Sequence, residues 1–278
     1  MVGNKNSAGK FDKRADAINS LLCVGLDSKY ESLPEKFRQG EHPQFEFNKH
    51  IISETHAFAA AYKPNIAFYE ARGSEGYAEL KMTLDFLRRE HPDILTVCDC
   101  KRGDTGNTNE SYAESLFDRF GFDAVTLNPY MGREPLEPFL KRSDKISMIL
   151  CRTSNPGAGE IQDLIVEGKP FDTAQGKPLW HRVAEKVVSE WNKNGNCMLV
   201  VGATYPEELK EIRKIAGDMT FLVPGIGAQG GETEEVTRSG LNSESKGLII
   251  NSSRGIIFAE HPAEEAKKLR DSINRFRK

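Results

Sequence analysis

Short apolar stretches of five to eight residues alternate along this chain with longer stretches whose apolar residues recur at helical spacing. The short stretches predict strands at 21–27, 62–68, 94–101, 124–128, 146–153, 198–203, 220–225 and 247–252. The longer ones predict helices at about 45–60, 76–89, 109–119, 134–141, 179–194, 206–215, 233–239 and 262–276. Strict alternation of this kind indicates a parallel sheet whose strands are joined by helices.

Eight such units in 278 residues predict closure into a single (β/α)8 TIM barrel that occupies 1–278. An open doubly wound sheet is the alternative, although no dinucleotide-binding glycine fingerprint follows the first strand. Residues 1–20, with one possible helix at 11–19, are expected to form an N-terminal cap on the barrel floor. Residues 155–178 are rich in glycine and proline and follow the fifth strand, where barrel active sites lie. We expect an active-site loop insertion there; a surface insertion without a role is the alternative.

The composition is that of an ordinary soluble protein, with 38% hydrophobic and 28% charged residues and a net charge of −3. This balance favours neither nucleic acid nor an anionic membrane as a partner. No apolar run is long enough to span a bilayer, and residues 1–13 lack the apolar core of a signal peptide, so we expect a cytoplasmic protein. The five cysteines are expected to be buried, reduced thiols, and the lone C-x-C at 98–100 does not predict a metal site.

Charged residues end the third predicted strand. Asp99 and Lys101 are two residues apart, so they should project from the same face, while Cys98 and Cys100 face the helices. Inward charges are costly in a barrel unless they pair or serve a site. Asp104 follows just beyond the strand. The sequence therefore predicts a catalytic cluster here, and a structural ion pair at the barrel mouth is the alternative.

A lysine between carboxylates keeps its proton, because their charges raise its pKa. Such a lysine is a poor Schiff-base nucleophile, but it can stabilise a carbanion and then protonate it. Asp27 ends the first predicted strand and Lys63 lies on the second, so both are expected on the same rim as Asp99 and Lys101. The chain is thus expected to carry a dense charged ring at one end of the barrel.

Glycine-rich loops follow the last two predicted strands, at 224–231 and 251–255. Loops in these positions expose backbone N–H groups to a phosphate, and Arg254 can add a bidentate contact. The sequence therefore predicts a phosphate site after strands seven and eight. Tight turns without a ligand are the alternative.

The combined pattern resembles the orotidine 5′-phosphate decarboxylase family across about 21–255. The matching motifs, in chain order, are Leu26-Asp27, Lys63-Pro64, Asp99-x-Lys101-x-x-Asp104, Asn107-Thr108, Pro224-Gly225-Ile226 and Ser253-Arg254. The segments 153–158, 227–231 and 251–255 are similar to the longer bacterial subfamily. The chain departs from many members at Thr105, where they carry an apolar residue after the second motif aspartate.

The resemblance implies cofactor-independent and metal-independent decarboxylation of orotidine 5′-monophosphate to UMP and CO2, the last step of de novo pyrimidine nucleotide synthesis. It implies that Lys101 donates the proton to pyrimidine C6 and that Asp99 lies near the substrate carboxylate and holds Lys101. It also implies a homodimer with shared active sites, in which Asp104 and Thr108 reach into the neighbouring site. The remaining implied contacts are ribose hydroxyls for Asp27 and Lys63, the pyrimidine edge for Ser154, and phosphate for Gln229, Ser253 and Arg254. Lys63 is also implied to join the catalytic charge network with Asp99, Lys101 and Asp104.

Two other functions remain open at this point. A decarboxylase of the same superfamily acts on a keto-sugar phosphate with Mg²⁺, but it carries a glutamate ligand where this chain has Lys63. A non-catalytic nucleotide-binding barrel is the second, since a fold alone does not imply catalysis. Sensitivity to a chelator would identify the first function, and absence of turnover would identify the second.

Overall fold

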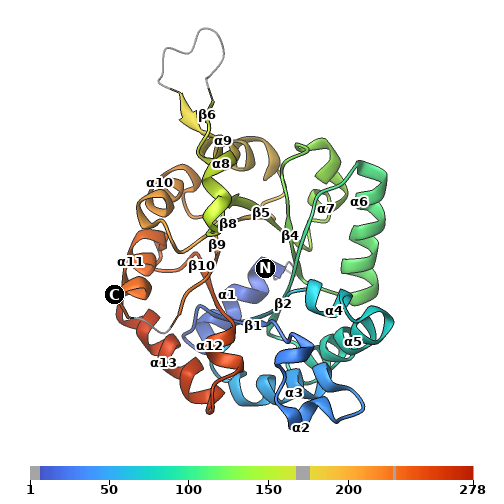
Figure 1. The fold of residues 1–278 in the computed structure, drawn as a ribbon. Helices are drawn as coiled ribbons and strands as arrows, with labels where there is room; N and C mark the ends of the chain where they lie inside the picture. Colours follow the sequence, from blue (N-terminus) through green and yellow to red (C-terminus); the bar gives the residue numbers. More distant parts are fainter. Residues whose placement is uncertain (1–6, 167–175, 228–229, 278) are drawn as a thin grey trace, which may run out of the picture.

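The computed structural model describes residues 7–166, 176–227 and 230–277. Eight parallel strands close into a barrel in the order β1-β10-β9-β8-β5-β4-β3-β2 (Figure 1). They are β1 (Leu22–Leu26), β2 (Ala61–Pro64), β3 (Leu95–Arg102), β4 (Ala124–Leu127), β5 (Ile146–Arg152), β8 (Cys197–Val201), β9 (Phe221–Pro224) and β10 (Leu248–Ser252). The predicted (β/α)8 barrel is confirmed, and the open doubly wound sheet is excluded.

Helices surround this barrel on the outside (Figure 1). The longer ones are α3 (Pro43–Thr55), α5 (Gly73–Glu90), α6 (Gly106–Ala113), α9 (Leu179–Lys186), α10 (Pro206–Ala216), α11 (Gly230–Gly240) and α13 (Pro262–Arg275). Shorter ones are α2 (Glu35–Arg38), α4 (Ala67–Glu70), α7 (Glu137–Leu140), α8 (Gly159–Gln162) and α12 (Arg254–Ile257). Wider π-helical turns extend α6 over Glu114–Phe120 and α9 over Val187–Trp191, and 3₁₀ turns occupy Tyr30–Ser32, Glu134–Leu136 and Pro156–Ala158.

The strands are apolar on both faces because side chains fill the barrel on one side and helices cover the other. Every residue of β1, β4, β8 and β10 is buried. All five cysteines are buried free thiols, as predicted, and burial raises the pKa of Cys23 to about 12. None of the described helices is long and apolar enough to cross a membrane.

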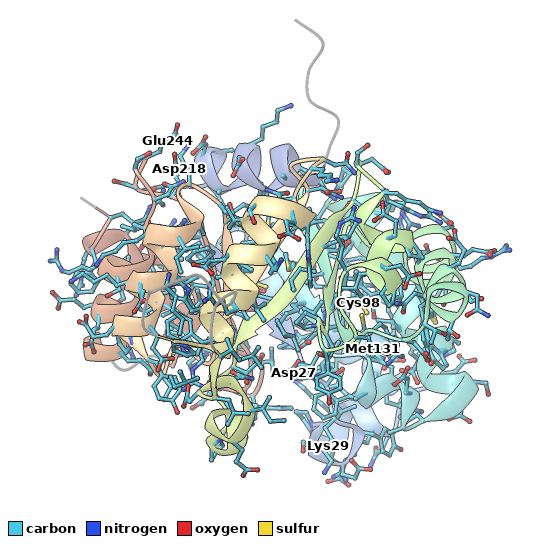
Figure 2. All side chains as sticks on the ribbon, turned by 90° about the horizontal axis from the view of Figure 1, so that it is seen from above. Asp27, Lys29, Cys98, Met131, Asp218 and Glu244 are labelled. Carbon is cyan, nitrogen blue, oxygen red and sulfur yellow. The ribbon has the colours of Figure 1, made fainter. Side chains whose placement is uncertain are left out.

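Helix α1 (Ser7–Ala17) packs beneath the amino ends of the strands. Ser7 donates from its backbone nitrogen to Asp144 O at 3.1 Å, Lys10 pairs with Asp123 at 2.7 Å, and Arg14 pairs with Asp93 at 2.6 Å. Each acceptor lies just before a strand. The predicted helix spanned 11–19. The observed helix begins four residues earlier, at Ser7, and ends two residues earlier, at Ala17. Figure 2 shows Asp27 and Lys29 at the end of the barrel opposite Asp218, Glu244 and α1.

The second strand is shorter than the predicted 62–68. It ends at Pro64, because the Asn65 side-chain oxygen accepts a hydrogen bond from Ala67 N at 3.2 Å and α4 begins there. A side chain that bonds the backbone two residues ahead turns the chain out of a strand. This local bond overrides the apolar pattern of 66–68.

Residues 155–166 follow the carboxyl end of β5, and 176–178 lead into α9 (Figure 1). These parts of the segment 155–178 hold a 3₁₀ turn, α8 and an antiparallel pair formed by β6 (Ile165–Val166) and β7 (Lys177–Pro178). Residues 167–175 lie outside the described structure. The described residues of this segment follow β5 at the barrel rim, and its role as an active-site loop stays a prediction.

Candidate functional site

A cavity of about 810 Å³ opens at the carboxyl ends of the strands. A volume of this size accommodates a small organic ligand such as a nucleotide. Its polar wall comes from β2, β3, β4 and the segments that follow β4 and β5. The polar residues that line it include Lys63, Asp99, Lys101, Thr126, Asn128, Thr153, Ser154, Asn155 and Gln162, and Pro224 at the end of β9 also lines it.

Three charged side chains form a row along this wall. Asp99 accepts from both lysines, with Lys63 Nζ at 3.2 Å from Oδ2 and Lys101 Nζ at 2.5 Å from Oδ1. The two lysines differ in exposure, since the Lys63 side chain is 4% exposed and that of Lys101 is 51% exposed. Lys63 is therefore a buried partner of Asp99, whereas Lys101 presents its ammonium to the cavity.

Charge interactions in this row hold Asp99 and Lys63 ionised. Burial raises the pKa of Asp99, but the charges of Lys63 and Lys101 outweigh burial and lower this pKa to about 2. Burial likewise lowers the pKa of Lys63, and the charges of Asp99 and Asp27 reverse the shift and raise it above its ordinary value. The site thus carries a stable carboxylate between ammonium groups at neutral pH.

Lys101 reaches this position through an irregular strand rather than by simple alternation. Its φ is +46°, and the pairing of β3 with β4 shifts between Cys98 and Arg102. Thr126 on β4 fills the gap: its hydroxyl accepts from Cys100 N at 3.0 Å and Lys101 N at 2.9 Å. Alternation predicted the correct pair, Asp99 and Lys101, but missed the bulge and Thr126.

Asp27 follows β1 directly and has a buried Oδ1 without a hydrogen-bond partner among the described residues. Its neighbours are held firmly. Tyr69 Oη donates to Leu26 O at 3.1 Å, and Ser28 O accepts from Gln44 Nε2 at 2.7 Å. Asp27 is not among the residues that line the cavity described above. Its unpaired carboxylate oxygen nevertheless has a free acceptor position for a donor.

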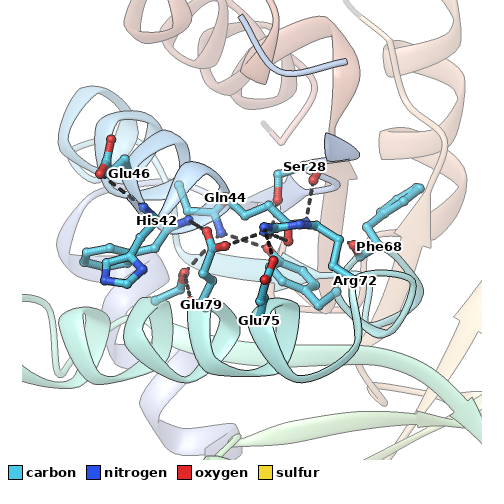
Figure 3. A network of polar contacts seen from close by, with 12 residues as sticks. Ser28, His42, Gln44, Glu46, Phe68, Arg72, Glu75 and Glu79 are labelled. Atoms are coloured by element: carbon cyan, nitrogen blue, oxygen red, sulfur yellow. Dashed lines mark hydrogen bonds and ion pairs between the residues drawn. The ribbon is translucent and has the colours of Figure 1, made fainter. Parts of the chain in front are cut away.

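Figure 3 shows the polar network that packs against the loop after β1, which carries Asp27 and Ser28. Arg72 donates to Gln44 Oε1 at 3.0 Å and pairs with Glu79. Glu79 in turn accepts from Phe45 N at 2.9 Å. The network joins α3 to the start of α5, so the loop that carries Asp27 rests on a buried, hydrogen-bonded base.

Arg152 anchors the segment that carries Ser154. This arginine ends β5, its side chain is 2% exposed, and it pairs with Glu208 and with Asp163, the latter at 3.3 Å. Gln162 Oε1 also accepts from Thr153 N at 2.9 Å. The predictions from sequence did not include Arg152, although a charge at a strand end beside an insertion was a usable signal.

The structure does not bring Asp104 and Thr108 to the cavity wall within one chain. Asp104 lies in the loop after β3, where its Oδ1 accepts from Thr105 N at 2.6 Å. Asn109 fixes its backbone, since Asn109 Oδ1 accepts from Asp104 N at 3.1 Å. Thr105 is exposed. The predicted placement of Asp104 and Thr108 in a neighbouring site remains a prediction.

The expected phosphate loops lie after β9 and β10. Gly225 has a φ of +97°, which favours glycine, and Ser253 accepts from Asn251 Nδ2 at 3.3 Å. Arg254 begins α12 and is exposed. Neither Ser253 nor Arg254 lines the cavity described above, and Gln229 lies outside the described residues.

Across 7–166, 176–227 and 230–277, no group of histidine, cysteine, aspartate and glutamate side chains is arranged to hold a metal ion. Cys98 and Cys100 are both buried beside β4, where Cys100 Sγ donates to Thr126 O at 3.3 Å. The expectation of a metal-independent and cofactor-independent site stays a prediction.

The sequence and the fold of this chain are both similar to those of known proteins. The model of the orotidine 5′-phosphate decarboxylase / HUMPS family matches residues 20–269. The orotidine 5′-phosphate decarboxylase of Cellvibrio japonicus is 42% identical over 91% of this chain and 89% of its own length. That of Christiangramia forsetii is 46% identical, over 89% and 88%. The structure of Leishmania donovani OMP decarboxylase is 38% identical, covers 98% of this chain and 99% of its own, and superposes with a TM-score of 0.84.

These similarities extend over the whole barrel, including the strands that carry Lys63, Asp99 and Lys101. The resemblance inferred from the motifs is therefore confirmed, and with it the predicted enzyme class, a decarboxylase. The chain belongs to the orotidine 5′-phosphate decarboxylase / HUMPS family.

Proposed function

We propose that this enzyme converts orotidine 5′-monophosphate to UMP and CO2 without a cofactor, as the last step of de novo pyrimidine nucleotide synthesis. The observation that carries the proposal is the Lys63–Asp99–Lys101 row on the cavity wall, in which Lys101 alone is half exposed. An ammonium fixed beside a carboxylate in a cavity is suited to stabilise negative charge that develops on a ligand.

In the proposed reaction, the bond between pyrimidine C6 and its carboxylate breaks and CO2 leaves. The electron pair stays on C6 in the plane of the ring, where the π-system cannot delocalise it. Lys101 stabilises this pair by its charge and then donates a proton to C6, which gives UMP. The resulting neutral amine regains a proton from water, so atoms and charges balance over the cycle.

Asp99 has two roles in the proposal. It holds Lys101 at 2.5 Å and remains ionised, because its pKa is lowered to about 2. It also lies beside the position proposed for the substrate carboxylate. Two like charges in one site repel each other, and this repulsion is relieved when CO2 departs.

The rest of the substrate is assigned to the rim around this row. Asp27, whose buried Oδ1 has a free acceptor position, and Lys63 bind ribose hydroxyls, and Ser154 bonds the pyrimidine edge. Gln229, Ser253 and Arg254 bind the phosphate. Contacts to a remote phosphate supply binding energy that orients the reacting ring.

We also infer that the enzyme acts in the cytoplasm as a homodimer, in which Asp104 and Thr108 complete the partner's site. The support is that Asp104, on the β3–α6 loop, and Thr108, in the first turn of α6, both lie outside the cavity of their own chain. Mixing an Asp99→Asn variant with an Asp104→Asn variant tests this, because one site of the heterodimer would regain both carboxylates. No recovered activity in the mixture would contradict the shared site.

Turnover of orotidine 5′-monophosphate, followed by the loss of its ultraviolet absorbance, tests the proposed function directly. We expect activity that is unchanged by a chelator such as EDTA. Loss of activity with EDTA and its return with Mg²⁺ would instead favour the metal-dependent decarboxylase of the superfamily. Binding of UMP without turnover would indicate a nucleotide-binding barrel.

A further inference from the structure

The two strands that build the charged row do not match in length. Between the pairs Cys98–Val125 and Arg102–Leu127, β3 advances four residues while β4 advances two. This bulge leaves extra β3 residues without a partner in the ladder. The buried N–H groups of such residues need an acceptor from elsewhere.

Thr126 supplies that acceptor with its side chain. It lies between Val125 and Leu127 on β4 and is 1% exposed. Its Oγ1 accepts from Cys100 N at 3.0 Å and Lys101 N at 2.9 Å and donates its one proton to Asp99 Oδ1 at 3.1 Å. This direction is consistent, because an ionised carboxylate only accepts. One hydroxyl thus bonds three consecutive residues, two of which belong to the proposed catalytic row.

Lys101 needs such support because its φ is +46°. This left-handed conformation is unfavourable for a residue with a side chain, and it persists where neighbouring contacts enforce it. The bond from Lys101 N to Thr126 is one such contact, and the ion pair of its Nζ with Asp99 Oδ1 is the other.

We propose that Thr126 is a positioning residue, whose hydroxyl sets the bulge in β3 so that Lys101 and Asp99 present their charges together to the cavity. It acts through these two residues and takes no part in proton transfer. The proposal rests on the proposed function for its kinetic readout. A purely structural role is the competing explanation, since a buried hydroxyl with three partners also stabilises the fold.

Thr96 offers a matched control near the opposite end of β3. Its hydroxyl donates to Asp123 Oδ2 at 2.9 Å and accepts from Asp123 N at 3.1 Å, and the residue is 7% exposed. Thr96→Val therefore removes a comparable buried threonine–aspartate bond from the same strand, away from the cavity. Any effect shared by Thr96→Val and Thr126→Val is structural.

The experiment compares Thr126→Val, Thr126→Ser and Thr96→Val with the unaltered enzyme. Misplacement of a reacting group by about 1 Å lowers rates by about 100-fold, so we expect Thr126→Val to lower kcat by about that factor while KM changes by only a few-fold. Thr126→Ser keeps the hydroxyl, so its kcat should lie within about ten-fold of that of the unaltered enzyme. Thr96→Val should lower the melting temperature and leave kcat unchanged.

Three results would overturn the proposal: an unchanged kcat in Thr126→Val, a Thr126→Ser variant as impaired as Thr126→Val, or an equal loss of kcat in Thr96→Val. If Thr126→Val does not fold, Thr126→Cys takes its place, because a thiol is a weak hydrogen-bond partner. Crystal structures of the unaltered enzyme and the variant provide a readout without turnover. If the unaltered enzyme is inactive, the proposed function fails, but the positioning role fails only if the variant keeps the φ of Lys101 and its bond to Asp99.

Discussion

Strand β3 takes part in a threonine–aspartate pair near each of its ends, and the two pairs differ in the cation beside them. At the floor, Asp123 Oδ2 accepts from Thr96 N and Thr96 Oγ1, both at 2.9 Å, and from Lys10 Nζ at 2.7 Å. At the rim, Asp99 accepts from Thr126 and from two lysines. Each carboxylate thus accepts hydrogen bonds or ion pairs from three donor atoms.

The cations differ in exposure and in backbone conformation. The Lys10 side chain is 26% exposed on a regular helix, whereas that of Lys101 is 51% exposed, faces the cavity and has a φ of +46°. The floor pair therefore serves stability, and the rim pair holds a charge available to a ligand. Barrel enzymes separate stability and catalysis between the two ends in this way.

The largest expected effect comes from removing the available charge. Lys101→Ala should lower turnover by about 10⁴-fold or more, because it removes both the proposed electrostatic stabilisation and the proposed proton donor. Steady-state kinetics with orotidine 5′-monophosphate measures this. Lys10→Ala is the matched control, since it removes a lysine paired with the floor aspartate. A Lys101→Ala variant that retains most of its activity would contradict the proposed role of the charge at the rim.

The next effect concerns stability at the rim. Asp99→Asn should lower the free energy of unfolding by about 3 kcal/mol, because Lys63 stays buried after losing its ionised partner. Chemical denaturation at neutral pH measures the difference. A companion variant, Asp99→Asn with Lys63→Met, should recover part of the stability without recovering turnover. If the double variant is less stable than Asp99→Asn, the lysine is not the source of the cost.

The pH dependence follows from the lowered pKa of Asp99. Its value of about 2 lies below the ordinary 3.8, so the stabilisation is present above pH 4 and is lost as the pH falls through 2. The stability advantage of the unaltered enzyme over Asp99→Asn should shrink by about 2 kcal/mol across this interval. Denaturation curves of both proteins between pH 6 and pH 2 measure it. An advantage that stays constant would show that Asp99 is not stabilised as a carboxylate.

The smallest effect is expected at the floor. Asp123→Asn weakens the bonds to Thr96 and Lys10 and should lower the free energy of unfolding by about 1 kcal/mol. The values of kcat and KM should not change, since the residue lies at the opposite end of the barrel from the cavity. Kinetics and denaturation of the same preparation separate the two. A loss of kcat in this variant would contradict the assignment of the floor pair to stability alone.

Much of this arrangement was readable from local pattern. The alternation of strand and helix predicted the closed barrel, and the spacing of Asp99 and Lys101 predicted their pairing, which the structure confirms. Strand ends were less predictable. The β2 boundary depends on the Asn65 side chain, and a single side-chain bond of this kind leaves no mark on an apolar pattern.

Residues that act through partners far along the chain escaped sequence reasoning. Arg152 bonds Glu208, and Thr126 bonds Asp99, Cys100 and Lys101; neither spacing is periodic. A threonine in an apolar strand is ordinary by itself. Its meaning depends on the bulge in the neighbouring strand, and therefore on a register that only the closed barrel defines.

The kind of chemistry at the rim was thus decided by residue types and their local spacing, because side-chain direction in a strand follows from two-residue periodicity. Which lysine is buried in the cavity wall and which is half exposed was decided by the tertiary structure. Lys63 and Lys101 are the same residue type beside the same carboxylate, with side chains 4% and 51% exposed. That division arises from closure of the barrel and from the bulge held by Thr126, which no single stretch of the chain encodes alone.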